Sequence, residues 1–183
     1  MKIINTKIEE LFIIEPEVFT DGRGYFFESY TKQRYQEIGL TDDFVQDNES
    51  RSIQRVIRGL HYQVGENAQG KLVRVASGRI LDVAVDIRFG SPTFGKYVTT
   101  ELSSNDFRQF WIPPGFAHGF AVLSKEAILC YKCTRPYSPE DERGIVFNDP
   151  TLAINWQIED PLVSRKDKSL PRFKDIAKDF IYE

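Results

Sequence analysis

Short stretches of alternating apolar and polar residues recur along the chain, and this pattern is typical of β-strands. The clearest one covers Arg79–Arg88, where the apolar positions are Leu81, Val83, Val85 and Ile87. A period of two predicts a strand with one buried face. A strand over Lys71–Ala76 precedes it, and Ser77-Gly78 between the two indicates a hairpin turn. Further strands are expected over Ile8–Ile14, Gly95–Leu102, Gln109–Ile112, Gly119–Leu123 and Ala127–Thr134.

Helical signals are confined to the first third and the end of the chain. Thr31–Ile38 is expected to be a short helix, with Thr31 as N-cap and Gly39 as its stop. The spacing of apolar residues also predicts short helices over Pro161–Asp167 and Pro171–Phe180. The sequence Asp21-Gly22-Arg23-Gly24 is turn-forming and predicts a hairpin or loop. Together these elements indicate an all-β jelly-roll barrel with short peripheral helices.

Composition limits the function classes. The 183 residues are 41% hydrophobic, which suits one folded domain over 1–183 and excludes wholesale disorder. No apolar stretch has the length of a membrane span. A net charge of −3 without a basic run argues against nucleic acid as the main partner. Two cysteines, and an N-terminus without a signal-peptide core, favour the cytoplasm.

The chain has only two histidines, so imidazole chemistry depends on His61 and His118. If the strand around His61 is regular, Gly59, His61 and Gln63 share one face, opposite Leu60 and Tyr62. His118 ends a Pro-x-Gly-x-x-His sequence that resembles the second motif of the cupin barrels. The first cupin motif of metal-binding members has His-x-His, whereas this chain has His61-Tyr62-Gln63. Two imidazoles and an amide make a poor transition-metal site, so no metal is expected.

Without a metal, His61 is suited to act as a general base, because its ordinary pKa lies near neutral pH. A base that inverts a stereocentre needs an acid on the opposite face, and Tyr131 is a candidate. Lys71 is a candidate to stabilise an enolate oxygen. The alternative interpretations are that His61 is a buried core histidine, that Tyr131 is a core aromatic residue and that Lys71 is an exposed lysine. Cys130 and Cys133 are interpreted as small apolar fillers, since residues three apart in a strand face opposite sides.

Arginines stand near aromatic residues at Arg23, Arg58 and Arg143. Guanidinium groups match phosphate geometry and tyrosine offers a face for a flat base, a combination that suits a nucleotide-linked ligand. Each charge taken alone also fits a solvated surface group.

Ordered motifs run nearly the whole length of the chain and identify a resemblance. They include Phe19-x-Asp21-x-Arg23-Gly24, Gln46-Asp47-Asn48-x-Ser50, Arg58-Gly59-Leu60-His61-Tyr62-Gln63, Gly70-Lys71-Leu72-Val73-Arg74-Val75, Trp111-Ile112-Pro113-x-Gly115-Phe116-Ala117-His118-Gly119-Phe120 and Asn148-Asp149-Pro150. In these motifs the chain resembles the dTDP-4-dehydrorhamnose 3,5-epimerase family.

The resemblance implies a cupin-like jelly roll, a homodimer and no cofactor. It implies that the substrate is a dTDP-4-keto-6-deoxy sugar. The implied reaction converts dTDP-4-dehydro-6-deoxy-D-glucose to dTDP-4-dehydro-L-rhamnose by inversion at C3 and C5.

Carried over by matching motif, His61 is the base with Asp167 as its carboxylate partner, Tyr131 is the acid, and Lys71 stabilises the enolate. Tyr137 matches the aromatic residue that stacks on thymine. The other positions that match substrate-binding residues are Arg23, Glu28, Gln46, Asn48, Arg58, His118, Glu142 and Lys166, with Asp47 inside the Gln46–Asn48 segment.

Other functions stay open at this point. Relatives with nearly the same motifs invert a single centre or use another nucleotide sugar. A metal-dependent cupin and a non-catalytic sugar-nucleotide-binding barrel are further alternatives.

Overall fold

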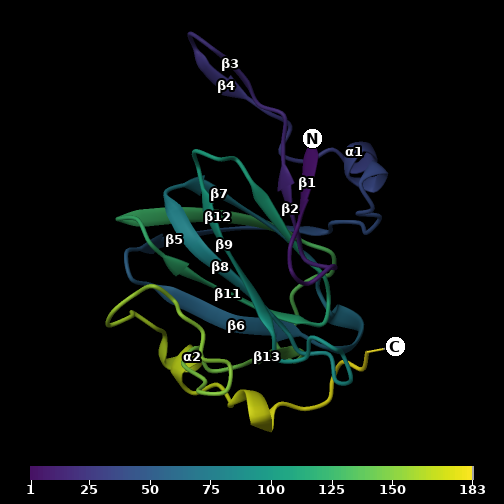
Figure 1. Cartoon of the computed structure of the whole chain (residues 1–183), viewed down its shortest axis with the longest axis vertical. Helices are drawn as coiled ribbons and strands as arrows, with labels where there is room; N and C mark the ends of the chain where they lie inside the picture. The colour runs from purple at the N-terminus through teal and green to yellow at the C-terminus, as the bar shows by residue number, and fades with distance from the viewer. Residues whose placement is uncertain (183) are drawn as a thin grey trace.

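The computed structural model describes residues 1–182, and two antiparallel sheets face each other in it (Figure 1). The first sheet has six strands in the order β1-β2-β10-β7-β12-β5. Their bounds are Lys2–Asn5 (β1), Phe12–Glu15 (β2), Gln109–Ile112 (β10), Lys71–Ser77 (β7), Glu126–Cys133 (β12) and Gln46–Ile53 (β5). The second sheet has five strands in the order β13-β6-β11-β8-β9. Their bounds are Glu142–Gly144 (β13), Ile57–Gln63 (β6), Phe116–Val122 (β11), Arg79–Asp86 (β8) and Tyr97–Ser103 (β9).

The inner faces of the two sheets enclose the main core. Val73 and Val75 of β7 pack there with Phe110 of β10, Phe116 of β11 and Leu129 of β12. Successive side chains of a strand point to opposite faces, so each inner strand contributes every second residue to this core. The predicted jelly-roll barrel is confirmed. The cavity described below lies where polar side chains replace this apolar filling.

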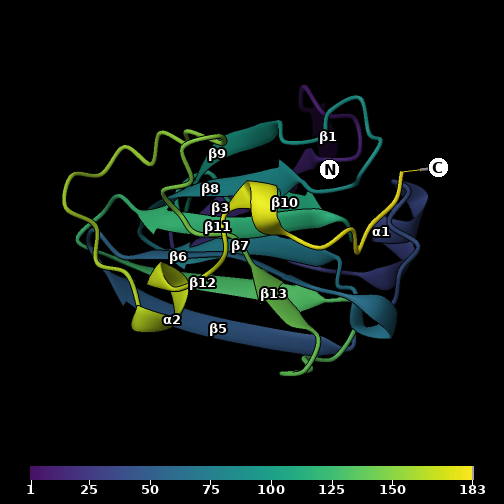
Figure 2. The same cartoon turned by 90° about the horizontal axis from the view of Figure 1, so that it is seen from below.

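A second core covers the outer face of the five-stranded sheet. Figure 2 shows the C-terminal segment crossing that face. Trp156 and Phe173 of this segment pack against Leu81, Val83 and Val85 of β8. Strand β8 is therefore buried on both faces, and the prediction of a single buried face is wrong. Leu81, Val83 and Val85 face outward under the C-terminal segment, while Ile80 and Ala84 face the barrel interior.

Three predicted elements differ from the structure. Ile8–Ile14 is not one strand, because Leu11 donates a backbone hydrogen bond to Ile8 in a turn and β2 begins only at Phe12. The C-terminal segment is mostly irregular. Its helical parts are α2 at Arg165–Lys168 and a 3₁₀ turn at Phe173–Asp175. Packing on the second core, rather than helix propensity, determines its course.

The predicted N-terminal helix is confirmed as α1, Lys32–Glu37. Gly39 follows it with φ +92°, a conformation that glycine adopts at low cost. A further 3₁₀ turn covers Gly65–Asn67. The hairpin of β3 (Phe19–Asp21) and β4 (Gly24–Phe26) projects away from both sheets (Figure 1). Over residues 1–182, no helix is long and apolar enough to span a membrane.

Candidate functional site

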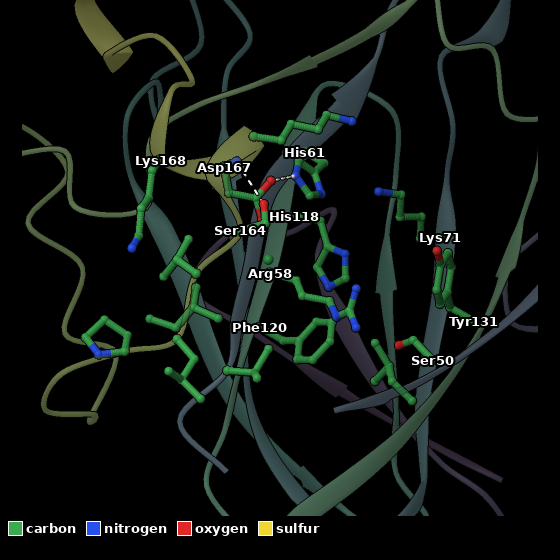
Figure 3. A pocket seen from close by; sticks show the side chains of 18 residues that line it. Ser50, Arg58, His61, Lys71, His118, Phe120, Tyr131, Ser164, Asp167 and Lys168 are labelled. Carbon is green, nitrogen blue, oxygen red and sulfur yellow. Dashed lines mark hydrogen bonds and ion pairs between the residues drawn. The ribbon is translucent and has the colours of Figure 1, made fainter. Parts of the chain in front are cut away.

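A cavity of about 640 Å³ lies inside the barrel, and it draws side chains from both sheets and from α2 (Figure 3). Strand β6 contributes Arg58 and His61, β11 contributes His118, and the facing sheet contributes Lys71 and Tyr131. Polar side chains in a barrel interior are costly unless they are paired or bind a ligand. This concentration of them marks the functional site.

His61 is bound to a buried carboxylate. Its Nε2 lies 2.8 Å from Oδ1 of Asp167, which is 4% exposed. Asp167 stands in α2, where its backbone N–H donates to the N-cap Ser164. Its second oxygen accepts a hydrogen bond from Gly59 N–H at 3.3 Å. Burial acts to raise the pKa of Asp167, but the hydrogen bond from His61 and the other partners hold it below the usual range. The carboxylate thus stays ionised and fixes the orientation of the imidazole.

His118 has a carboxylate of its own. Its Nε2 lies 2.9 and 3.1 Å from the two oxygens of Asp82, which is fully buried on β8. Asp82 is not among the site residues predicted from the sequence. The available signal was a carboxylate between apolar residues in a buried strand, a position that requires a partner.

Lys71 and Tyr131 lie across the cavity from His61 (Figure 3). Burial lowers the pKa of the Lys71 ammonium, although the Cys133 thiol, Asp82 and Glu142 act in the opposite direction. Burial raises the pKa of the Tyr131 phenol. The phenol therefore keeps its proton at neutral pH. The site thus presents an imidazole on one side of a central space and a phenol and an amine on the other.

A polar cluster borders the cavity beside β13. Glu142 accepts hydrogen bonds from Tyr137 Oη at 2.6 Å and from Lys166 Nζ at 2.5 Å. Burial acts to raise the pKa of Glu142, but these two bonds lower it. Gln46 accepts from the backbone N–H of Tyr137 at 2.8 Å and donates to Asn48. Tyr137 itself is half exposed to solvent.

Arg58 shares the cavity with His61, although strict alternation assigned it to the opposite face. The register between β11 and β6 shifts between His118 and Phe120, next to Gly59, and this irregularity breaks the alternation. Arg58 Nε donates to Ser52 at 3.0 Å. The predicted division between the two faces holds for the other residues: His61 lines the cavity, whereas Leu60 and Tyr62 pack in the second core on the outer face.

Three predicted substrate-binding residues lie away from this cavity within the chain. Arg23 is at the tip of the projecting hairpin, with 91% of its side chain exposed and an ion pair to Asp21. Glu28 is paired with Arg34 of α1. Asp47 lies on the outer face of its sheet, 2.8 Å from Lys132 Nζ.

The arrangement of potential metal ligands bears on the alternative of a metal-dependent cupin. Over residues 1–182, no three His, Cys, Asp or Glu side chains are grouped as metal ligands. Cys133 is buried beside Lys71, whereas Cys130 lies near Glu49. Both are free thiols on one strand and do not converge. The residues present therefore do not fit a cupin metal centre.

The comparisons with known proteins agree on one family. The family model described as dTDP-4-dehydrorhamnose 3,5-epimerase matches residues 5–175. The chain is 53% identical to the dTDP-4-dehydrorhamnose 3,5-epimerase of Salmonella typhimurium, and the match covers 93% of this chain and 94% of that protein.

Solved structures agree as well. A dTDP-6-deoxy-D-glucose-3,5-epimerase from Legionella pneumophila Philadelphia 1, solved in complex with dTDP-4-keto-L-rhamnose, is 52% identical with a TM-score of 0.96. That match covers 100% of this chain and 98% of the other. A 3′-monoepimerase from Streptomyces bikiniensis, in complex with dTDP-quinovose, is 29% identical with a TM-score of 0.87, over 93% and 87% of the two chains. The chain belongs to the dTDP-4-dehydrorhamnose 3,5-epimerase family.

Proposed function

We propose that the protein is a cofactor-independent isomerase that inverts C3 and C5 of dTDP-4-dehydro-6-deoxy-D-glucose to give dTDP-4-dehydro-L-rhamnose. The observation that carries this proposal is the arrangement of His61–Asp167 on one side of the cavity and Tyr131 with Lys71 on the other. Double epimerisation is preferred because the 3,5-epimerase relatives are 52–53% identical, whereas the monoepimerase is 29% identical.

The chemistry follows from the acidity of carbon atoms beside a ketone. His61 removes the proton from C3 or C5, and the electron pair of the broken C–H bond moves to the C4 oxygen as an enolate. Lys71 stabilises the negative oxygen with its ammonium charge. Tyr131 then donates its proton to the opposite face of the same carbon, and the enolate collapses to the ketone. The phenolate regains a proton and His61 loses one, so the overall step changes no oxidation state.

The polar cluster beside the cavity has a role in binding the nucleotide. We expect Tyr137 to stack on thymine; its hydroxyl donates to Glu142 and its backbone N–H donates to Gln46, and these bonds restrict its movement. Arg58 and Lys166 are available for the pyrophosphate, since both are cations at the cavity wall. Asn48, held by Gln46, and His118, held by Asp82, complete the substrate contacts on the barrel side.

The test of the proposed reaction is solvent deuterium exchange followed by NMR. Deuterium is expected at both C3 and C5 of the sugar, and His61→Ala is expected to abolish both exchanges. Exchange at one carbon would instead assign a monoepimerase. A dTDP-linked and a GDP-linked 4-keto sugar compared side by side would establish the nucleotide preference. Binding without any exchange would favour the non-catalytic alternative.

We also propose a homodimer in which the hairpin of one chain reaches the cavity of the other. The hairpin exposes Phe19, Tyr25 and Phe26 to solvent, an unusual amount of apolar surface for so small an element. It carries Arg23 away from the barrel of its own chain (Figure 1). A mixture of Arg23→Ala and His61→Ala chains is therefore expected to regain activity, because one mixed site has both residues intact. No recovery after subunit exchange would contradict this arrangement.

Two further expectations accompany the proposal. The chain acts as one domain, since the C-terminal segment supplies Asp167 to a cavity built from earlier strands. A cytoplasmic location is favoured by the two free thiols, which a reducing compartment preserves. Cell fractionation with an antibody would test the location.

A further inference from the structure

One wall of the cavity consists of carbon side chains. Its members come from the turn before β6, from β11 and β12, and from the segment that precedes α2. They are Val56, Phe120, Leu129, Pro161, Leu162 and Val163. Figure 3 shows Phe120, one of these residues, separated from His61 by His118 and Arg58. We call this set the apolar wall.

The apolar wall lies at the opposite end of the cavity from the proposed thymine site. Tyr137 is bound to Gln46, which pairs with Cys133 between β5 and β12. Leu129 of the apolar wall pairs with Ser50, four residues further along both strands. At about 3.3 Å per residue, this places the wall roughly 13 Å from the Gln46 end. Tyr131 lies between the two ends, since it pairs with Asn48.

The wall is held in place by backbone hydrogen bonds. Leu162 N–H donates to the carbonyl of Arg55 at 2.8 Å, and Ile57 N–H donates to the carbonyl of Leu162 at 3.0 Å. Phe120 and Leu129 belong to the main core and are 5% and 1% exposed. A fixed apolar surface beside a polar site favours a ligand group that has no hydrogen-bonding capacity.

A sugar nucleotide has very few such groups. Its phosphates, hydroxyls and ketone all need polar partners, and the thymine methyl and the deoxyribose methylene belong to the nucleoside at the other end of the cavity. The remaining apolar group is the methyl carbon, C6, that distinguishes a 6-deoxy sugar. It is bonded to C5, one of the two carbons at which the proposed reaction takes place.

We propose that the apolar wall binds the C6 methyl group and makes the enzyme selective for 6-deoxy sugars. This inference rests on the proposed function and names the part of the site that recognises the substrate class. Burying one methyl group in a hydrophobic pocket changes kcat/KM by roughly 10- to 200-fold. An apolar wall of this kind therefore distinguishes a sugar with the methyl from one without it.

The test compares two substrates in deuterium exchange at C3, a step that both can undergo. One is dTDP-4-dehydro-6-deoxy-D-glucose, and the other is the dTDP-4-ketopentose that lacks C6. The wild-type protein is expected to prefer the hexose by roughly tenfold or more. The double variant Leu162→Ala/Val163→Ala is expected to lose most of this preference through a lower kcat/KM for the hexose, with the pentose unchanged.

A matched control is available on the same segment. Ile158 is partly buried and does not line this cavity, so Ile158→Ala is expected to keep the substrate ratio. An equal loss for both substrates in the double variant would overturn the proposal, because it would mean that the wall only supports the fold. A wild-type protein without preference would overturn it as well. Absence of exchange with either substrate would instead refute the proposed function, and this inference with it.

Discussion

His61 and His118 are cross-strand partners on β6 and β11, and each imidazole is hydrogen-bonded to a separate buried carboxylate. Side chains at such paired positions lie close together on one face of a sheet. The carboxylates come from different places, Asp167 from α2 and Asp82 from β8. The His61 side chain is 29% exposed, whereas that of His118 is 8% exposed. This difference suits His61 to exchange protons and His118 to hold the substrate.

Replacing Asp82 by Asn is expected to weaken substrate binding. The charge-assisted hydrogen bond to His118 would be lost, and bonds of this kind are worth about 1.5–3 kcal/mol. KM should therefore rise by roughly 10- to 100-fold while kcat changes less, as measured by initial rates of epimerisation. Asp86→Asn is the control, because Asp86 is also buried on β8 but is bound to Arg88, Ser91 and Thr93. An unchanged KM in Asp82→Asn would contradict the role given to this pair.

Replacing Asp167 by Asn is expected to lower kcat by roughly 10²- to 10⁴-fold, the range typical of general acid–base catalysis. The amide cannot stabilise the imidazolium that forms when His61 takes a proton from carbon. KM should change little, since Asp167 contacts His61 and Gly59 rather than the cavity centre. Single-turnover deuterium exchange at C5 measures this directly. A rate within tenfold of wild type would remove Asp167 from the catalytic pair.

Lys71 is expected to set the alkaline limit of the reaction. Burial lowers its pKa below the ordinary value of 10.5, and the charged form is the one that stabilises the enolate. Activity should therefore fall as pH rises through this lowered pKa. Lys71→Met should reduce kcat by roughly 10²- to 10³-fold and abolish this alkaline fall.

Tyr131→Phe is the matched comparison for the pH profile. Burial raises the pKa of Tyr131 above its ordinary value of 10.0, the opposite direction to its effect on Lys71. The residual activity of Tyr131→Phe should keep the alkaline fall. A profile that loses the fall in Tyr131→Phe and retains it in Lys71→Met would reverse the two assignments.

The central strands and the inward position of His61 were predictable because alternation and turn residues are local signals. The pairing of His118 with Asp82 was not, since it depends on how β11 and β8 align across 36 positions of the chain. The second core was missed for a related reason. Alternation along β8 identified Leu81, Val83 and Val85 as one apolar face, but it did not show that the C-terminal segment covers this face or that the opposite face lines the main core.

The structure of the C-terminal segment was not predictable for a different reason. Its spacing of Phe173, Ile176 and Phe180 is compatible with a helix, yet only Phe173–Asp175 forms a helical turn. A short segment without enough local stability takes the shape that its packing requires, and these residues bind the outer core instead. The position of Arg23 relative to the cavity was not predictable from the sequence either, because its hairpin projects from the barrel.

Arg55 is expected to position the segment that carries both the apolar wall and Asp167. It has φ +70°, and its Nε donates to the carbonyls of Glu159 at 3.2 Å and Asp160 at 3.0 Å. Arg55→Ala should lower stability by about 1 kcal/mol, or about 2–4 °C in Tm. It should also speed amide hydrogen exchange over residues 159–168 and lower kcat/KM by roughly tenfold, because Asp167 would hold His61 less firmly. Arg51→Ala is the control, since Arg51 is exposed on β5 and paired only with Glu126 among the described residues. Arg55→Ala could instead lower Tm while leaving hydrogen exchange in this segment and turnover unchanged. That result would mean that Arg55 stabilises the fold but does not position the base.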